Sequence, residues 1–457
     1  MTVNTKTCIF IFLSALLLTF SSTEANGKIR LKKKKQQFTE QNIRVKDVPK
    51  IHNRKRLKKD TIYHNLYLAK KIPSKMVLVD RGHLHMGIEK NDSLWGFQTP
   101  ERHVSVEDFL MDPTEVTNAM YKEFVNDITS AIIEERKAIY GSVENAKNSL
   151  YIINKVTGEK RLDPSQIIYA YQQYDYLRAA APEYQDINPD SLPMITKDTA
   201  YIDDAGKIVC ERLTRPYTGD YDFLNTYIVN IYPDTLCWVK DFPDADMEMY
   251  YRYYFSHPDY NNYPVVGVTW EQAKAYCAWR TEQMKKKLGD KYGDTQPFRL
   301  PTEAEWEHAA RGRQQNRFPW ESYDKDKGEY YANFMVDEGN YADDGNIITS
   351  HAGSYLPNEY GLYDMAGNVA EWTSTAYSFA GVADMNNVNP INCASTENPT
   401  NTKKVVRGGS WKDSERFVQS AWRTSESQNK AHSYIGFRCV RSLAATTTGK
   451  RVLMKKK

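Results

Sequence analysis

Apolar runs long enough to span a bilayer are missing from this chain of 457 residues. The longest covers residues 9–20, only 12 positions, whereas a membrane helix needs about 20 apolar residues. Lys6 precedes this run, and small and polar residues follow it up to Ala25. That order is typical of a secretory signal peptide, with a buried core helix as the alternative. We therefore expect residues 1–25 to be removed and the mature protein to be exported.

Cysteine is scarce, with six residues in all. Cys8 lies before the apolar run, so it cannot be the lipid-bearing first residue of a mature lipoprotein. An oxidising compartment would allow the remaining thiols to pair, but their odd number leaves at least one of them free or bonded outside the chain. The five that remain after residue 25 are Cys210, Cys237, Cys277, Cys393 and Cys439.

Net charge is small, at +3, but it is strongly segregated along the chain. Residues 28–59 hold 14 basic and 2 acidic side chains, and residues 450–457 hold 5 basic ones, which leaves about −14 for residues 60–449. The segment 26–72 has too few large apolar groups to order itself, so we predict a flexible basic arm there and a basic tail at 444–457. The arm is either a spacer or a tether to anionic lipid, lipopolysaccharide or an acidic partner.

Apolar residues make up 41% and aromatic residues 12% of the chain, enough for a folded body between the two basic ends. We expect a strand at 76–79 and a helix capped by Thr117, with Tyr121, Phe124 and Val125 on one face. A Tyr- and Asp-rich stretch at about 130–260, with a strand at 226–231, has a looser pattern. We interpret it as an insertion.

Local signals sharpen again after residue 264. Residues 265–268 are predicted to form a buried strand, and short strands are expected at 403–406 and 435–440. Two capping boxes predict helices, Thr269 with Gln272 and Thr302 with Glu305. Long loops punctuated by Gly, Asn and Asp fill much of 313–441 and need internal fixings such as metals or a disulfide.

Five motifs in the second half of the chain resemble the formylglycine-generating-enzyme (sulfatase-modifying factor) superfamily. The resemblance implies a mixed α+β domain with little regular secondary structure, related to C-type lectin-like modules. It covers roughly residues 73–443, with the insertion at about 130–260. The motifs are VVGVTW at 265–270, RLPTEAEWE at 299–307, YGLYDMAGNVAEW at 360–372, RGGSW at 407–411 and GFRC at 436–439.

Enzymatic members of that superfamily hold copper with two thiolates a few residues after their Gly-Gly-Ser. Here the corresponding positions are Asp413 and Val418. Cu(I) selects soft sulfur ligands, which a carboxylate and an isopropyl group do not supply. We therefore expect a pseudoenzyme without copper and without catalytic residues.

The related sulfoxide synthases carry a His-x3-His-x-Glu motif, and the nine histidines of this chain do not contain it. His83, His85 and His103 are the alternative candidates for a metal site. An ordinary half-exposed strand explains them as well.

Structural calcium is implied by the same resemblance, in one or two sites. The first would use Asn333, Asp344 and the main-chain oxygens of Phe334 and Asn346. The second would use Asp364, Glu371 and the main-chain oxygens of Gly367 and Val369. Hard oxygen ligands suit this ion, although the acids could instead be solvated or bind loop amides. The resemblance also implies a disulfide between Cys277 and Cys439.

Three further strings, at 232–235, 405–413 and 431–438, look like the GldK/PorK branch of the superfamily. Its role implies a periplasmic ring subunit at the inner face of the outer membrane, in type IX protein secretion and gliding motility. The expected partners are further copies of the chain, a GldN/PorN-type protein and outer-membrane secretion components, and no nucleic acid. Known members are lipoproteins. Attachment to the membrane here would therefore use partner proteins or the basic arm, or else the start codon is a different one and the chain is lipidated. An active oxidase of the formylglycine-generating type and a glycan- or peptidoglycan-binding module are the alternative functions.

Overall fold

The structure is a computed structural model. It describes residues 76–87, 101–153, 158, 160–185, 187, 191–203, 207–289, 296–320, 330–336, 341–342, 344–378, 386–390 and 402–443. The predicted signal peptide, the basic arm and the basic tail lie outside these residues. Within the described ranges, no helix has both the length and the apolar character needed to cross a membrane.

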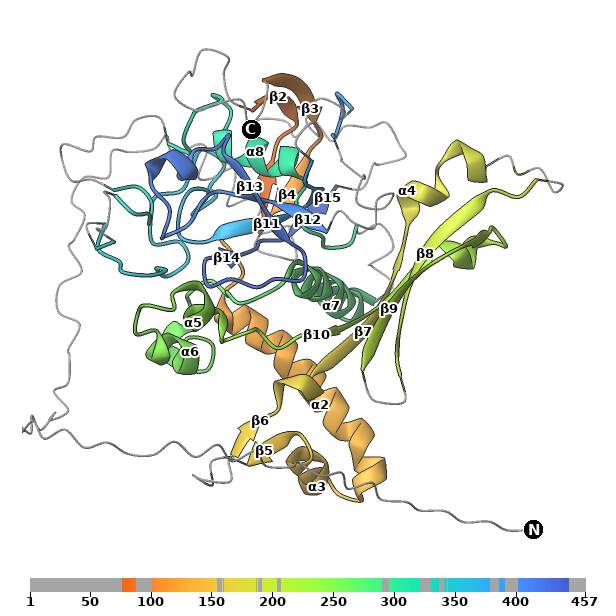
Figure 1. The fold of residues 1–457 in the computed structure, drawn as a ribbon. Coiled ribbons are helices and arrows are strands. Elements are labelled where there is room, and N and C mark those ends of the chain that lie inside the picture. The colour runs from red at the N-terminus through yellow and green to blue at the C-terminus, as the bar shows by residue number, and fades with distance from the viewer. Residues whose placement is uncertain are drawn as a thin grey trace, which may run out of the picture. The chain divides into compact units, whose positions relative to one another are not determined.

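Short strands and helices alternate with long loops (Figure 1). The chain has the predicted mixed α+β fold, with sparse regular structure. In chain order the elements are β1 (Val77–Val79), β2 (Gly82–Met86), β3 (Arg102–Val106), β4 (Phe109–Met111), α2 (Asn118–Tyr140), α3 (Val143–Asn148), β5 (Tyr151–Ile153), β6 (Lys160–Leu162), β7 (Ile168–Tyr174), α4 (Tyr176–Ala179), β8 (Met194–Ile202), β9 (Ile208–Pro216), β10 (Leu224–Asn230), α5 (Cys237–Asp241), α6 (Glu248–Tyr253), α7 (Trp270–Leu288), α8 (Glu303–Arg311), β11 (Ala370–Ala376), β12 (Lys403–Arg407), β13 (Arg423–Ser427), β14 (Ile435–Gly436) and β15 (Val440–Ser442).

Two small sheets form the frame of the core. One has the order β1-β4-β15, so strands from the two ends of the described chain pair side by side. The other has the order β13-β12-β11-β14, and within it β14 runs parallel to β11. The frame therefore depends on pairings between segments that are distant in sequence, which the sequence patterns do not reveal.

Helix α2 begins where the sequence predicts, because the Thr117 side chain accepts a hydrogen bond from the backbone of Met120 at 3.3 Å. Tyr121, Phe124 and Val125 are buried on its inner face. The helix has 23 residues and ends at Gly141, whose φ of 76° lies in the left-handed region. It therefore continues past residue 130, so the insertion begins as an extension of a core helix.

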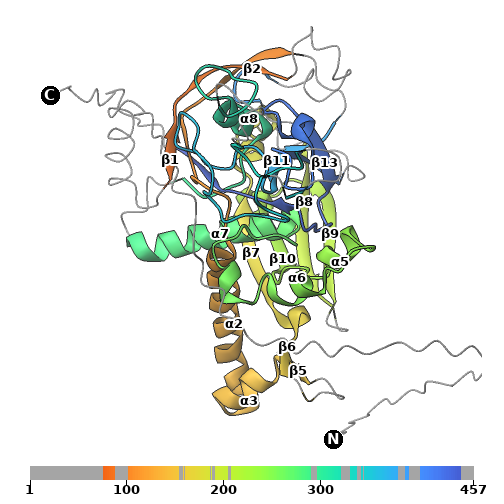
Figure 2. The same cartoon turned by 90° about the vertical axis from the view of Figure 1, so that its left-hand side faces the viewer.

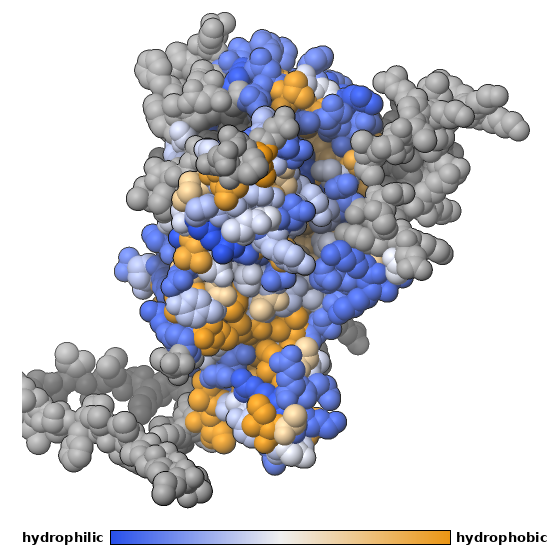
Figure 3. Space-filling model, turned by 90° about the vertical axis from the view of Figure 1, so that its right-hand side faces the viewer, coloured by the Kyte–Doolittle hydropathy of each residue, from blue (hydrophilic) through white to orange (hydrophobic). Residues whose placement is uncertain are grey.

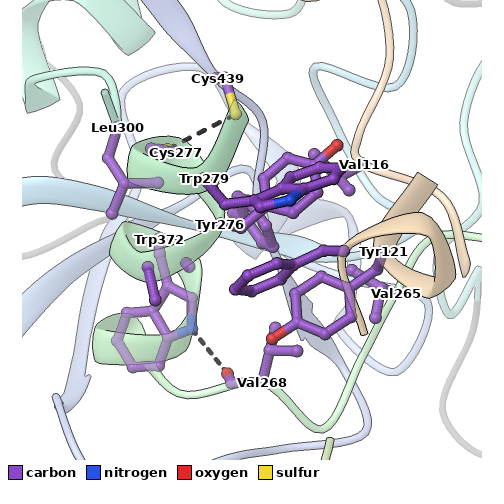
Figure 4. Close-up of a cluster of buried hydrophobic side chains, with 14 of the residues drawn as sticks. Val116, Tyr121, Val265, Val268, Tyr276, Cys277, Trp279, Leu300, Trp372 and Cys439 are labelled. Carbon is purple, nitrogen blue, oxygen red and sulfur yellow. Dashed lines mark hydrogen bonds between the residues drawn. The ribbon is translucent and has the colours of Figure 1, made fainter. Parts of the chain in front are cut away.

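Both predicted capping boxes are present, at the start of α7 and of α8. Helix α7 buries Tyr276, Cys277 and Trp279 in the main apolar cluster, against Tyr121 of α2 and Trp372 of β11. Figure 4 shows these side chains converging from several elements, with the Trp372 indole donating to the carbonyl of Val268 at 3.0 Å. The capping signals thus place the two helices correctly from local sequence alone.

Two strand predictions need correction. Residues 265–268 are buried but form no strand, because Gly267 adopts a φ of 72° and turns the backbone. The Gly267 N–H donates to His432 at 2.9 Å and its carbonyl accepts from Asp234 at 2.7 Å, so the segment is held by separate loops. The stretch 435–440 is split into β14 and β15, which join different sheets.

The insertion builds three antiparallel pairs, β5 with β6, β7 with β10 and β8 with β9. The predicted strand at 226–231 is present as β10, and its neighbour β8 lies beside it, where the Asp198 backbone donates to the Asn225 side chain at 2.9 Å. The Tyr121 hydroxyl donates to the Ile231 carbonyl at 2.9 Å. That bond ties the end of the insertion sheet to the core helix.

Candidate functional site

Asp413 and Val418, which we expect to correspond to the copper-binding thiolates, both have other partners here. The Asp413 carboxylate accepts hydrogen bonds from the Ser410 amide at 3.0 Å and the Ser410 hydroxyl at 2.6 Å. Its second oxygen pairs with the Lys412 ammonium at 2.9 Å. This carboxylate therefore fixes the turn that follows the Gly-Gly-Ser motif.

Val418 ends a short 3₁₀ turn and is completely buried, with 0% of its surface exposed. It packs in an apolar cluster with Phe334 and Ala366. A Cβ atom on Gly409 would lie 2.8 Å from the Val418 side chain, so the two segments are in close contact. Neither Asp413 nor Val418 offers sulfur, and the donor set does not fit copper.

Buried carboxyl groups gather in the loop that leads into β11, where the second calcium set is expected. Glu371 is fully buried, and Arg438 contacts both of its oxygens, at 2.7 to 2.9 Å. The Trp306 indole donates to the same carboxylate at 2.9 Å. Glu371 is thus fully engaged by protein donors.

Asp364 and Glu115 have one unsatisfied oxygen each. Asp364 accepts from the Gly353 amide at 2.6 Å through one oxygen, and its other oxygen is buried without a hydrogen-bond partner. Glu115 accepts from the Asn368 side chain at 3.0 Å, and its second oxygen has no other donor. Glu115 and Asp364 lie within hydrogen-bond reach of each other, so either a shared proton or a cation satisfies the two acids. Burial raises the pKa of both groups, and for Glu115 the negative charge of Asp364 raises it further.

A cation suits this arrangement, because an unpaired carboxylate oxygen in the interior is costly and calcium coordinates such oxygens directly. Asp364 belongs to the set predicted from sequence, together with the carbonyls of Gly367 and Val369 on the same loop. Glu115 was missed, since it lies 253 positions before Asn368. Within the described residues, no three His, Cys, Asp or Glu side chains converge on one point, so an ion here would also need main-chain oxygens.

The first predicted calcium set is brought together around Asp344. Its carboxylate accepts from the Phe334 amide at 2.8 Å and from the Asn346 amide at 3.0 Å. The Asn333 side chain donates to the Ile348 carbonyl at 2.8 Å. Loop amides thus already bind the acid of this set, and the case for an ion is weaker than at Asp364.

Gly367 connects the two predicted calcium loops. Its φ is 72°, and a Cβ atom there would collide with the Asn333 carbonyl. That carbonyl accepts from the Asn368 amide at 2.7 Å, so the backbones of the two loops are in direct contact. A residue with a side chain at 367 would force them apart.

With this geometry established, comparison with known proteins gives the family. The sequence profile of the sulfatase-modifying factor enzyme 1-like domain matches residues 67–443. The chain belongs to this family.

Among individual relatives of this family, formylglycine-generating enzyme of Bos taurus is 27% identical over 382 residues, covering 82% of this chain and 76% of that protein. The inactive Cα-formylglycine-generating enzyme 2 of Bos taurus is 33% identical over 184 residues, 39% of this chain and 50% of that protein, so the chain matches only half of its length. PvdO from Pseudomonas aeruginosa superposes with a TM-score of 0.44 and 19% identity, covering 80% of this chain and 94% of PvdO.

The thiols of Cys277 and Cys439 do meet in this sulfatase-modifying-factor domain. Their sulfur atoms lie 3.5 Å apart in the core (Figure 4), farther than the roughly 2.05 Å of a disulfide. Both are present as thiols, and burial raises the pKa of Cys439 well above its usual value. The disulfide stays a prediction, with its two partners already adjacent.

The three histidines on β2 and β3 lie on one exposed face. His85 is paired with His103 across the strands, with ring centroids 4.3 Å apart, while His83 shares a hydrogen bond with Ser105 at 3.1 Å. They form no three-ligand group in the described part of the chain. The strand interpretation accounts for them.

Proposed function

We propose that this chain is a pseudoenzyme, a non-catalytic scaffold built on the formylglycine-generating-enzyme fold. The proposal rests on the two positions expected to correspond to the copper-binding thiolates. There Val418 packs in a buried apolar cluster, and Asp413 accepts hydrogen bonds that fix a turn. The relative named inactive Cα-formylglycine-generating enzyme 2 supports the idea that this fold can be kept when formylglycine-generating activity is absent.

A turnover assay tests the proposal. The purified chain, with and without copper, is incubated with a sulfatase-type cysteine peptide, and formylglycine is measured by mass spectrometry. We expect none, and none from Asp413→Cys with Val418→Cys either, because catalysis also needs a shaped peptide groove. Formylglycine formed by the unaltered chain would refute the scaffold role.

The finer role rests on the strings that resemble the GldK/PorK branch. On that basis the chain would form a periplasmic ring at the inner face of the outer membrane with a GldN/PorN-type partner, supporting type IX secretion and gliding motility. Affinity purification from outer membranes, followed by identification of the co-purified proteins, tests this. Recovery of the chain without secretion components would argue against it.

Structural calcium is part of the proposal. The ion would be held by the free oxygen of Asp364, the carbonyls of Gly367 and Val369, and the free oxygen of Glu115. Glu371, which the sequence predicts as a direct ligand, is bound by Arg438 and Trp306, so Glu115 takes its place in the proposed set. Arg438 also donates to the Tyr363 carbonyl at 2.9 Å and so steadies the loop. The first set, around Asp344, would hold a second ion.

A glycan-binding role is the second candidate, favoured by one feature of the insertion. Tyr176 is 72% exposed and lines an open pocket with Tyr174 and Gln185. Rings with one apolar face and nearby amides suit sugars. Binding of peptidoglycan fragments by the monomer, abolished in Tyr176→Ala, would support this role. Equal binding by both forms would exclude this pocket.

A further inference from the structure

Strand β9 is the outer strand of its sheet. All nine of its residues pair with β8, from Ile208 with Ile202 to Pro216 with Met194. The other side of β8 lies beside β10, which in turn pairs with β7. Figure 2 shows the four strands in the order β7, β10, β8, β9. Among the described strands, none pairs with the outer edge of β9.

This edge lacks two of the features that keep sheet edges apart, a bulge and an interior proline, although it carries charged side chains at Glu211, Arg212 and Arg215. Natural edge strands are usually short, bulged or interrupted by proline. The pairing of β8 and β9 has no bulge over nine residue pairs, and Pro216 stands only at the last position. Figure 3 views the right-hand side of Figure 1, where apolar residues are exposed between polar ones. A long regular edge of this kind is suited to accept another strand.

The sequence of β9 is complementary to itself in the antiparallel sense. If two copies pair about Leu213, Leu213 faces its counterpart, and Glu211 of each copy lies opposite Arg215 of the other. Because successive side chains of a strand point to opposite faces, Glu211, Leu213 and Arg215 all lie on the same face. Leu213 is 47% exposed. Opposite charges directly across an antiparallel pair are stabilising, and like charges are destabilising.

We propose that two copies of this chain associate through β9, antiparallel and centred on Leu213, to form one continuous sheet. The inference rests on the self-association in the proposed function and assigns one of its contacts to a surface, because a twofold pair closes as a dimer and a ring would need a second interface. In the single chain, Glu211 accepts from the Tyr201 hydroxyl at 2.9 Å and Arg215 pairs with Asp222. Tyr201 belongs to β8 and Asp222 to the turn at 220–223, so neither contact is a strand pairing on the outer edge of β9.

Charge reversal gives a decisive test in the full mature chain. Because each residue appears twice in a twofold pair, Glu211→Arg places two arginines opposite each other at two points. We expect Glu211→Arg and Arg215→Glu each to weaken self-association at least tenfold by sedimentation. The double exchange should restore it. Arg215→Glu also removes the partner of the buried Asp222, so its melting temperature should fall, and a cooperative melting transition would show that each variant is folded. Equal association by all forms, or failure of the double exchange to recover, would overturn the proposal.

A cross-link provides the second measurement. Residues directly opposite in antiparallel strands have Cα atoms about 4.5–5.5 Å apart, within reach of a disulfide. In a Cys210→Ser background, Leu213→Cys should give a covalent dimer on mild oxidation. Val239→Cys on α5, 42% exposed, is the matched control and should stay monomeric. If the chain forms rings but Leu213→Cys gives no cross-link, the interface lies elsewhere on the chain and the scaffold role is unaffected. Absence of any self-association would count against the ring itself.

Discussion

Arg438 and Glu371 form an ion pair in which both side chains are completely buried. The guanidinium also donates to the carbonyls of Tyr363 and Asp364, at 2.9 and 3.3 Å. One arginine from the GFRC motif thereby joins the strand of its partner acid to the loop with the unpaired Asp364 oxygen. The pair matters because removing one partner leaves a buried charge uncompensated.

Arg438→Met should lower the free energy of unfolding by about 3–5 kcal/mol, measured by urea denaturation. The double variant with Glu371→Gln should lose less, because no unpaired charge remains. If the double variant were as unstable as the sum of the single variants, the two residues would not be coupled.

Chelation of calcium should lower the melting temperature, since an ion that binds only the folded state stabilises it by about 2.7 kcal/mol at a hundredfold excess over its Kd. Glu115→Gln keeps the acceptor for Asn368 but removes one charge, so EGTA should then have little further effect. Asn145→Asp, on the exposed part of α3, is a control that should respond to EGTA like the unaltered chain. A melting curve that EGTA leaves unchanged would exclude the ion.

Lys404 should destabilise the fold at neutral pH. It is 3% exposed, its ammonium lies 4.3 Å from the Trp270 ring centre, and burial followed by the charges of Lys274 and Arg212 lowers its pKa from 10.5 to about 8. The folded state therefore disfavours the charged amine below pH 8, and this cost falls as pH rises from about 8 to 10.5.

Lys404→Met should consequently raise the stability at pH 7 by about 1–3 kcal/mol, less whatever the contact with Trp270 contributes. The advantage should shrink toward pH 10. The neighbouring exposed Lys403→Met is the control and should change little at either pH. A gain that does not depend on pH would point to packing as its cause.

Oxidised protein should contain a bond between Cys277 and Cys439. Because Cys439 is buried with a raised pKa, the bond should resist dithiothreitol until denaturant is added. Reduction should then cost about 2–4 kcal/mol, since the bond closes a loop of 162 residues. Peptide mapping without reductant locates the pair, and Cys277→Ser serves as the comparison. Two free thiols in protein recovered from an oxidising compartment would refute it.

Sequence reasoning succeeded where the cause is local. Thr117, Thr269 and Thr302 cap helices because each side chain bonds a backbone amide within its own first turn. It erred at residues 265–268, where burial alone suggested a strand and Gly267 turns the chain instead.

The candidate site shows the same division. The GFRC and AGNVAEW strings indicate that Arg438 and Glu371 are important, but neither spacing nor composition shows that the two form an ion pair. Glu115 carries no motif that we recognised, because its relation to Asp364 is created only by folding. Contacts across such separations need the three-dimensional structure.

Helix α2 has a mechanical consequence. Its first turns are clamped, since Asn118 donates to the Tyr254 and Tyr260 carbonyls and Lys122 to the Asn261 side chain. Its residues from Asn126 to Tyr140 extend on the order of 20 Å beyond the last fully buried position, Val125. A load applied near Gly141 is therefore taken up first by the bonds of Arg136 to Ser149 and Gln166. It then reaches Asp127, which Trp279 and Gln283 of α7 hold, so the tip of the helix transmits strain to α7 before it reaches Tyr121.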